Sequence, residues 1–103
     1  MAALRNWKTI PRKTLTASPT PLSAVSIICQ EFTVQGLATN SADFVIGGPD
    51  TTVALSVPRA KSTPHNFYPV DIAGEPKGYD LSKIYVAGTA GDILACQYVS
   101  FEE

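Results

Sequence analysis

Short apolar runs separated by glycine and proline clusters are the feature that most restricts the fold of this chain. The runs are rich in β-branched and aromatic residues and follow one another at short spacing. Eight prolines, seven glycines and a charged fraction of only 17% are typical of a turn-rich β protein and not of a helical bundle. In 103 residues this pattern predicts one all-β domain, a small antiparallel β-sandwich or jelly-roll-like barrel with an extended N-terminal arm.

Periodicity places the expected strands. They cover residues 22–35, 44–46, 51–57, 67–72, 83–87 and 92–101, and residues 79–83 indicate a helical turn. The apolar positions of the first strand change parity near Gln30, which predicts a bulge or a bend there. Pro69 indicates that the fourth strand is an edge strand or irregular. The last strand is apolar on both faces, which indicates a central strand or burial by a partner.

The loop Gly88-Thr-Ala-Gly91-Asp92 precedes the last strand and resembles a phosphate-binding loop. A phosphate loop requires a helix after it, whose N-terminus faces the anion. The residues after Asp92 have strand periodicity instead, so we expect Gly88 and Gly91 to form the tip of a β-hairpin. The residues 73–82 before the preceding strand are expected to form a loop.

Charge divides the chain into an arm, residues 1–21, and a body, residues 22–103. The first thirty residues contain four basic and no acidic side chains, whereas the remainder contains four basic and nine acidic ones. Pro11, Pro19 and Pro21 exclude a continuous helix from the arm, which should be extended with a short strand near Trp7 to Ile10. Such an arm is either a docking tail or a solvated terminus. A tryptophan there should pack against the body or a neighbour.

The sequence offers few side chains for catalysis or metal binding. His65 has no nucleophile motif near it in sequence and is expected to be a surface-loop residue. Asp50, Asp71, Asp80 and Asp92 flank turns without calcium-loop spacing, where Asp usually binds its own backbone. We therefore expect no enzymatic activity, no catalytic or metal site and no cofactor.

Cys29 and Cys96 lie in apolar runs and should be buried free thiols rather than a disulfide. We expect no signal peptide and no membrane span. The arm has only four basic side chains and the body is acidic, which also argues against nucleic acid as a partner. The chain should be made in a reducing cytoplasm.

The C-terminal part of the sequence resembles small virion structural proteins of tailed bacteriophages. The resemblance covers about residues 25 to 100 and rests on "LATNSADFVIGGPDTT" followed by "YPVDIAGEPKGYDLSKIYVAGTAGDILACQYV". The matching positions are Asn40, Gly47, Gly48, Asp80, Leu81, Ile84, Tyr85, Val86, Gly91, Asp92 and Tyr98. Proteins of this kind are β-sandwich or jelly-roll-like modules that decorate or cement a capsid, or that serve elsewhere on the particle. The N-terminal arm lies outside this resemblance and differs from these modules.

The resemblance implies a non-enzymatic decoration or cement protein on the outer surface of a phage capsid, synthesised in the host cytoplasm. Its expected partner is the major capsid protein, and we expect a homo-oligomer, a dimer or a trimer, on the particle. A tail or head–tail accessory protein of the same fold is the alternative. The expected partner contacts are in the arm: Arg5, Trp7, Lys8, Ile10, Arg12 and Lys13. Trp7 would be the apolar anchor, and the charges would steer docking.

Overall fold

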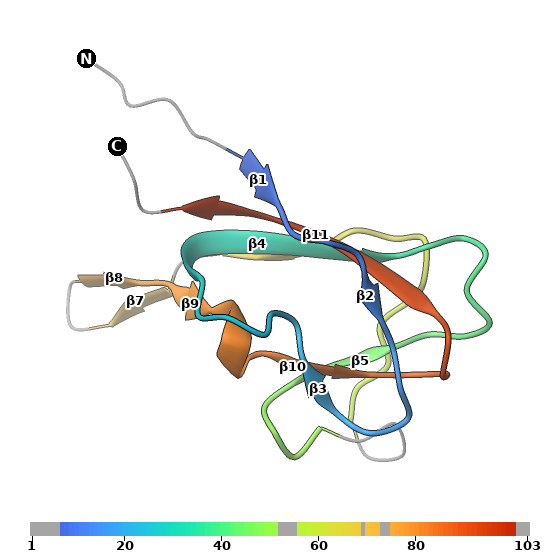
Figure 1. The fold of residues 1–103 in the computed structure, drawn as a ribbon. Coiled ribbons are helices and arrows are strands. Elements are labelled where there is room, and N and C mark those ends of the chain that lie inside the picture. Colours follow the sequence, from blue (N-terminus) through green and yellow to red (C-terminus); the bar gives the residue numbers. More distant parts are fainter. Residues whose placement is uncertain (1–6, 52–55, 69, 73–74, 101–103) are drawn as a thin grey trace.

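The described residues form an all-β fold of antiparallel sheets, as the sequence predicts, in which two larger sheets face each other and a third is a two-stranded hairpin (Figure 1). This computed structural model describes residues 7–51, 56–68, 70–72 and 75–100. Among these residues there is one 3-10 helix, η1 (Leu81–Lys83), at the predicted helical turn, and no α-helix. In Figure 1 the larger sheet lies above the smaller one, and a hairpin projects from one end.

The larger sheet has the strand order β1-β11-β4-β6, with β2 also paired to β11 and β9 paired to β4. Its strands are β1 (Trp7–Thr9), β2 (Lys13–Thr14), β4 (Ile28–Gly36), β6 (His65–Phe67), β9 (Tyr79–Asp80) and β11 (Ile93–Ser100). The smaller sheet has the order β3-β10-β5, formed by β3 (Thr20–Pro21), β10 (Tyr85–Ala87) and β5 (Val45–Gly47). The hairpin consists of β7 (Val70–Ile72) and β8 (Glu75–Lys77).

The hydrophobic core lies between the two sheets. Phe32 and Leu94 reach it from the larger sheet and Val86 from β10, and all three are almost completely buried. Connecting segments add further buried side chains, among them Leu15 and Phe44. Full burial of side chains of this size contributes roughly 1.5–3 kcal/mol each. The sandwich is therefore closed by residues from its connections as well as from its strands.

The predicted bulge is present at Gln30. Val99 of β11 is opposite Glu31, but the next residue, Ser100, is opposite Cys29, so Gln30 is the extra residue of β4. This insertion reverses the parity of the strand, so that Cys29 before it and Phe32 after it both face the core. The strand β11 is also central, as its two apolar faces indicate, because it pairs with β4 on one side and with β1 and β2 on the other.

The predicted hairpin at Gly88 to Gly91 is wrong. The strands β10 and β11 belong to different sheets and do not pair, so this loop carries the chain from one sheet to the other. Gly91 has a φ of +94°, a conformation that favours glycine, as a tight reversal requires. Strand periodicity correctly identified both segments, but it contains no information about their partners.

Asn40 and Asp92 hold this loop against the turn after β4. The side chain of Asn40 accepts from the Ile93 backbone N–H and donates to the Ile93 carbonyl, both at 2.9 Å. The Asp92 carboxylate accepts from the backbone N–H groups of Ser41 and Ala42, at 2.9 to 3.2 Å. These backbone donors, first of all Ser41, lower the pKa of Asp92, with a further contribution from the Lys61 charge.

Other segments also differ from the predicted strands. The first strand begins at Ile28 instead of at residue 22. Residues 22–27 lie beside η1 instead, and the Leu81 N–H donates to the Ile27 carbonyl. The expected loop 73–82 contains β8 and β9, two short strands that lack an alternating apolar pattern. The strand expected at 51–57 lies mostly outside the described residues, as does Pro69.

Candidate functional site

The predicted contact segment lies along the edge of the larger sheet. Trp7 in β1 is opposite Val99, and Lys13 in β2 is opposite Leu94, so the two short strands follow β11 in succession. Between them, the Ile10 backbone N–H donates to the Cys96 carbonyl at 3.4 Å. The segment from Trp7 onward is extended and contains the expected strand near Trp7, while Arg5 lies outside the described residues.

The structure distributes the predicted contact residues over two surfaces. Residues directly opposite each other in a sheet share a face, so Trp7 lies on the same face as Val99, which is the outer face of the larger sheet. Its side chain is 50% exposed. Ile10 is partly buried and packs against the core cluster between the sheets. Trp7 and Ile10 therefore cannot form one continuous apolar anchor.

A groove opens beside Ile10, between the segment that joins β1 to β2 and the segment that begins at β3. It has a volume of about 370 Å³ and is walled by residues 10–13 on one side and by residues 21–25 and 27 on the other. The floor and walls are largely apolar, and Arg12 and Lys13 contribute the two cationic side chains of its lining. Three predicted contacts, Ile10, Arg12 and Lys13, thus meet at one concave surface.

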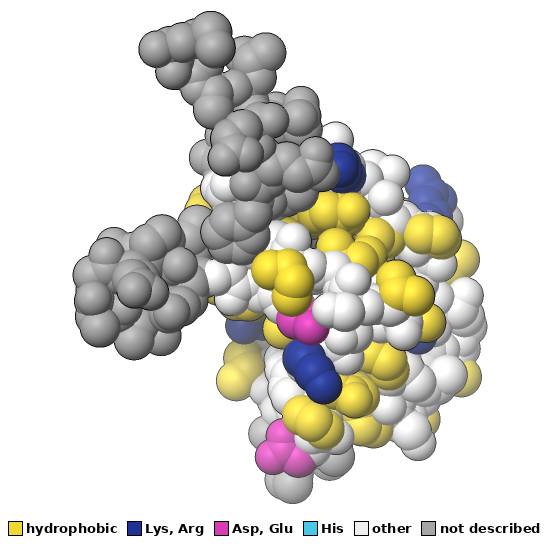
Figure 2. All heavy atoms as spheres, turned by 60° about the vertical axis from the view of Figure 1, so that its left-hand side comes forward, with side chains coloured by type: hydrophobic (Ala, Val, Ile, Leu, Met, Phe, Trp, Pro, Cys, Tyr) yellow, Lys and Arg dark blue, Asp and Glu magenta, His cyan; other side chains and the backbone are white. Residues whose placement is uncertain are grey.

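The second wall of the groove extends the apolar surface. Val25 is 65% exposed, and Ile28, immediately beyond the groove, is 56% exposed. Ser23 shapes this wall, because its hydroxyl accepts from the Val25 N–H and donates to the Val25 carbonyl. Figure 2, which turns the left side of Figure 1 forward, shows hydrophobic side chains scattered over this side among few charged ones. The sequence assigned residues 22–27 to a strand, so this wall was missed.

His65 has a structural role in β6. Its Nε2 lies 3.0 Å from the Ala60 carbonyl oxygen, and its ring packs edge-on against Phe44 with centroids 5.6 Å apart. It is half-buried in a strand, not on a surface loop as expected. These contacts fix the ring within the packing between β6 and the core.

Asp80 caps the helical turn η1. Its carboxylate accepts from the backbone N–H and hydroxyl of Ser82, at 3.0 and 2.7 Å, and from the Ser26 hydroxyl at 2.8 Å. The side-chain hydrogen bond from Ser82, followed by that from Ser26, lowers the pKa of Asp80. Like Asp92, this carboxylate is occupied by local donors in the manner expected of aspartates at turns.

Cys29 and Cys96 are buried free thiols, as predicted. Burial in the apolar core raises the pKa of Cys29 to about 11 and that of Cys96 to about 12. The thiolate is the reactive form of cysteine, so both side chains behave as core residues at neutral pH.

Within the described parts of the chain, three or more His, Cys, Asp or Glu side chains nowhere gather closely enough to hold a metal ion. No helix in these parts has the length and apolar character needed to cross a bilayer. We find no match to the chain among protein-family models, curated proteins or solved structures.

Proposed function

We propose that this protein is a non-enzymatic decoration or cement protein that binds the outer surface of a phage capsid. The observation that supports this most is the groove beside Ile10, in which an apolar concave surface combines with the cations Arg12 and Lys13. The centre of a protein–protein interface is apolar and depleted of charge, and its rim is polar, which is the arrangement that the groove offers. The resemblance of residues 25 to 100 to small virion proteins of tailed bacteriophages is the reason for proposing a phage particle as the site of action.

The groove would receive an apolar segment of the major capsid protein that carries carboxylates. Burial of that segment against Ile10 and Val25 would supply affinity, and Arg12 and Lys13 would select acidic neighbours and set the register. The remaining predicted contacts, Arg5, Trp7 and Lys8, would form a second contact with the capsid, with Trp7 on the outer face of the larger sheet. Because a capsid repeats each site by symmetry, a small stabilisation of the shell by each bound copy would add up over the whole particle. Neighbouring copies on the shell would associate as a dimer or a trimer.

Charge reversal in the groove tests the docking role. The variant Arg12→Glu/Lys13→Glu should fold normally, because the Arg12 side chain is exposed and that of Lys13 is half-buried at the sheet edge. Its binding to purified mature capsids of the encoding phage, measured by co-sedimentation, should fall at least tenfold. Lys83→Glu is the control for each single reversal, Arg12→Glu and Lys13→Glu, because Lys83 is exposed at the end of η1 and does not line the groove.

Equal loss of binding for the control and the single reversals would indicate a nonspecific charge effect and contradict the groove. A tail or head–tail accessory protein of the same fold is the second candidate. Immunogold labelling of intact particles separates the two locations. Label confined to the tail would exclude the capsid role.

A further inference from the structure

The outer face of the larger sheet contains a row of four uncharged hydrogen-bonding side chains. Thr9 is opposite Gln97, Gln97 is opposite Thr33, and Thr33 is opposite Asn66. These residues come from β1, β11, β4 and β6 in order, so they share one face and one line across the sheet. Neighbouring strands are about 4.8 Å apart, and the row therefore spans roughly 14 Å.

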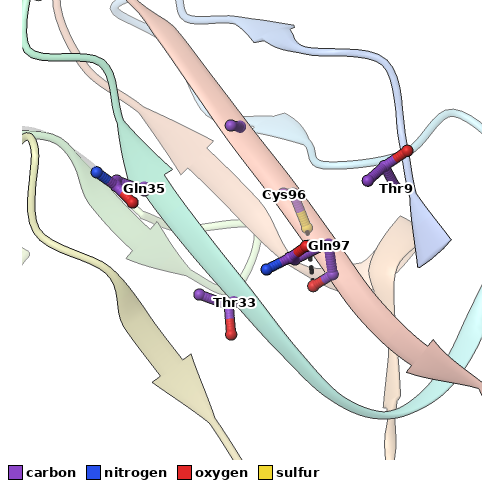
Figure 3. A pocket seen from close by; sticks show the side chains of 6 residues that line it. Thr9, Thr33, Gln35, Cys96 and Gln97 are labelled. Carbon is purple, nitrogen blue, oxygen red and sulfur yellow. Dashed lines mark hydrogen bonds between the residues drawn. The ribbon is translucent and has the colours of Figure 1, made fainter. Parts of the chain in front are cut away.

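A shallow hollow of about 230 Å³ lies along this row. It is lined by Thr9, Thr33, Gln35, Gln97, Ala95 and Cys96. Figure 3 shows that the labelled side chains come from three neighbouring strands, with Thr33 and Gln35 from β4, Cys96 and Gln97 from β11, and Thr9 from β1. The small side chain of Ala95 lies between longer neighbours, which is consistent with a depression at this point.

The lining offers both donors and acceptors but no charge. Each amide side chain contributes an NH2 group and a carbonyl oxygen, and each threonine contributes a hydroxyl that donates and accepts. The Thr33 hydroxyl donates to the Asn66 side-chain oxygen at 2.7 Å, which orients the Asn66 NH2 group. Glu31, two residues before Thr33 on this face, is only 7% exposed. A ligand that matches this lining is neutral and carries many hydroxyl groups.

Trp7 adds an aromatic surface at the border of the row. It precedes Thr9 by two residues in β1, so both side chains lie on the same face, and its indole is half-exposed. The C–H face of a sugar ring stacks on an aromatic ring, while its hydroxyls bind amide and hydroxyl side chains. The spacing between neighbouring strands is also close to the length of one sugar unit in a chain.

From these features we propose that the outer face of the larger sheet binds a neutral oligosaccharide, with the row Thr9–Gln97–Thr33–Asn66 as its hydrogen-bonding surface and Trp7 as its stacking surface. This site is separate from the groove and does not depend on capsid binding. Only Trp7 belongs to both proposed contacts, so the test leaves Trp7 unchanged.

The test is a titration of the full isotope-labelled chain, followed by amide NMR, with four neutral hexasaccharides: maltohexaose, cellohexaose, mannohexaose and chitohexaose. At least one should shift the backbone amides of Thr9, Thr33 and Gln97 together with the indole N–H of Trp7. The double variant Thr33→Val/Gln97→Leu should weaken that binding at least tenfold. Thr89→Val is the control, because Thr89 is exposed in the loop after β10 and should leave binding unchanged.

Three results would overturn the proposal. The first is the absence of shifts with all four sugars at millimolar concentration, and the second is binding that the double variant does not weaken. The third is protection of this face by a second copy of the chain, seen as a dimer in light scattering that the double variant dissociates. Loss of capsid binding in the groove variant with retained sugar binding would keep the two proposals distinct.

Discussion

Replacing Gly88 with alanine tests how closely the segment after β2 packs against the loop between the sheets. A Cβ atom added at Gly88 would lie 2.8 Å from Leu15 Cδ1, closer than two carbon atoms approach without repulsion. Leu15 is only 1% exposed, so its side chain has little free space into which it can move. Such overpacking costs about 1–3 kcal/mol. We therefore expect Gly88→Ala to lower the free energy of unfolding by that amount.

The same contact predicts that Leu15→Ala removes the destabilising effect of Gly88→Ala. Leu15→Ala alone should cost about 2–5 kcal/mol, because it removes a buried side chain and leaves a cavity. In that background the new methyl group at position 88 no longer meets Leu15 Cδ1. The remaining effect of Gly88→Ala is the reduced entropy of the unfolded chain, which stabilises by about 0.4–1 kcal/mol. The added alanine should then be neutral or stabilising.

Urea denaturation of the wild type, both single variants and the double variant measures this coupling. The midpoints should shift at constant m, and the coupling energy, which is the difference between the effects of Gly88→Ala in the two backgrounds, should be about 1–4 kcal/mol. In thermal melts each kcal/mol corresponds to about 4–8 °C for a domain of this size. Additive effects of the two substitutions would refute the reasoning, because they would mean that Leu15 does not pack against Gly88. The contact between the arm and the loop would then be wrong.

Three further predictions concern an amide, two carboxylates and two thiols that the fold buries or holds by hydrogen bonds. Asn40→Ala should lower the free energy of unfolding, measured with urea, by about 1–3 kcal/mol, because the Ile93 N–H loses its side-chain acceptor and the Ile93 carbonyl keeps only the hydrogen bond from the Leu37 N–H. The lowered pKa values of Asp80 and Asp92 stabilise the fold above about pH 4, and this stability should be lost as the pH falls through their folded-state values. Urea midpoints measured from pH 7 to pH 2 should show this loss, and Asp92→Asn should reduce it; a flat profile would contradict it. A thiol reagent at pH 8 should modify neither Cys29 nor Cys96 in the folded protein and both in 8 M urea, and rapid reaction of the native protein would contradict their burial.

The sequence predicts those parts of the fold that depend on local patterns. The parity change near Gln30 indicated a bulge or a bend, and the two apolar faces of the last strand indicated a central position or burial by a partner, because side-chain alternation reports on burial. The structure has the bulge and the central position. The sequence also indicated a helical turn at residues 79–83, and the structure has η1 there, capped by the Asp80 carboxylate. These features require no knowledge of which strands pair.

Pairing and concave surfaces could not be predicted in the same way. Two strands joined by a short loop commonly form a hairpin, but β10 and β11 enter different sheets because β4 and β5 occupy the neighbouring positions. The groove joins residues 10–13 to residues 21–25 and 27, and its two walls meet only after both segments have packed against the core. The row from Thr9 to Asn66 depends on the register of four strands, which no single segment encodes.

A cryo-electron microscopy map of the intact phage particle tests the proposed role most directly. We predict copies of this fold on the outer surface of the shell, with the groove of residues 10–13, 21–25 and 27 against an acidic, apolar segment of the major capsid protein. Density for the fold only in the tail would contradict the account, as would copies on the capsid whose groove faces solvent.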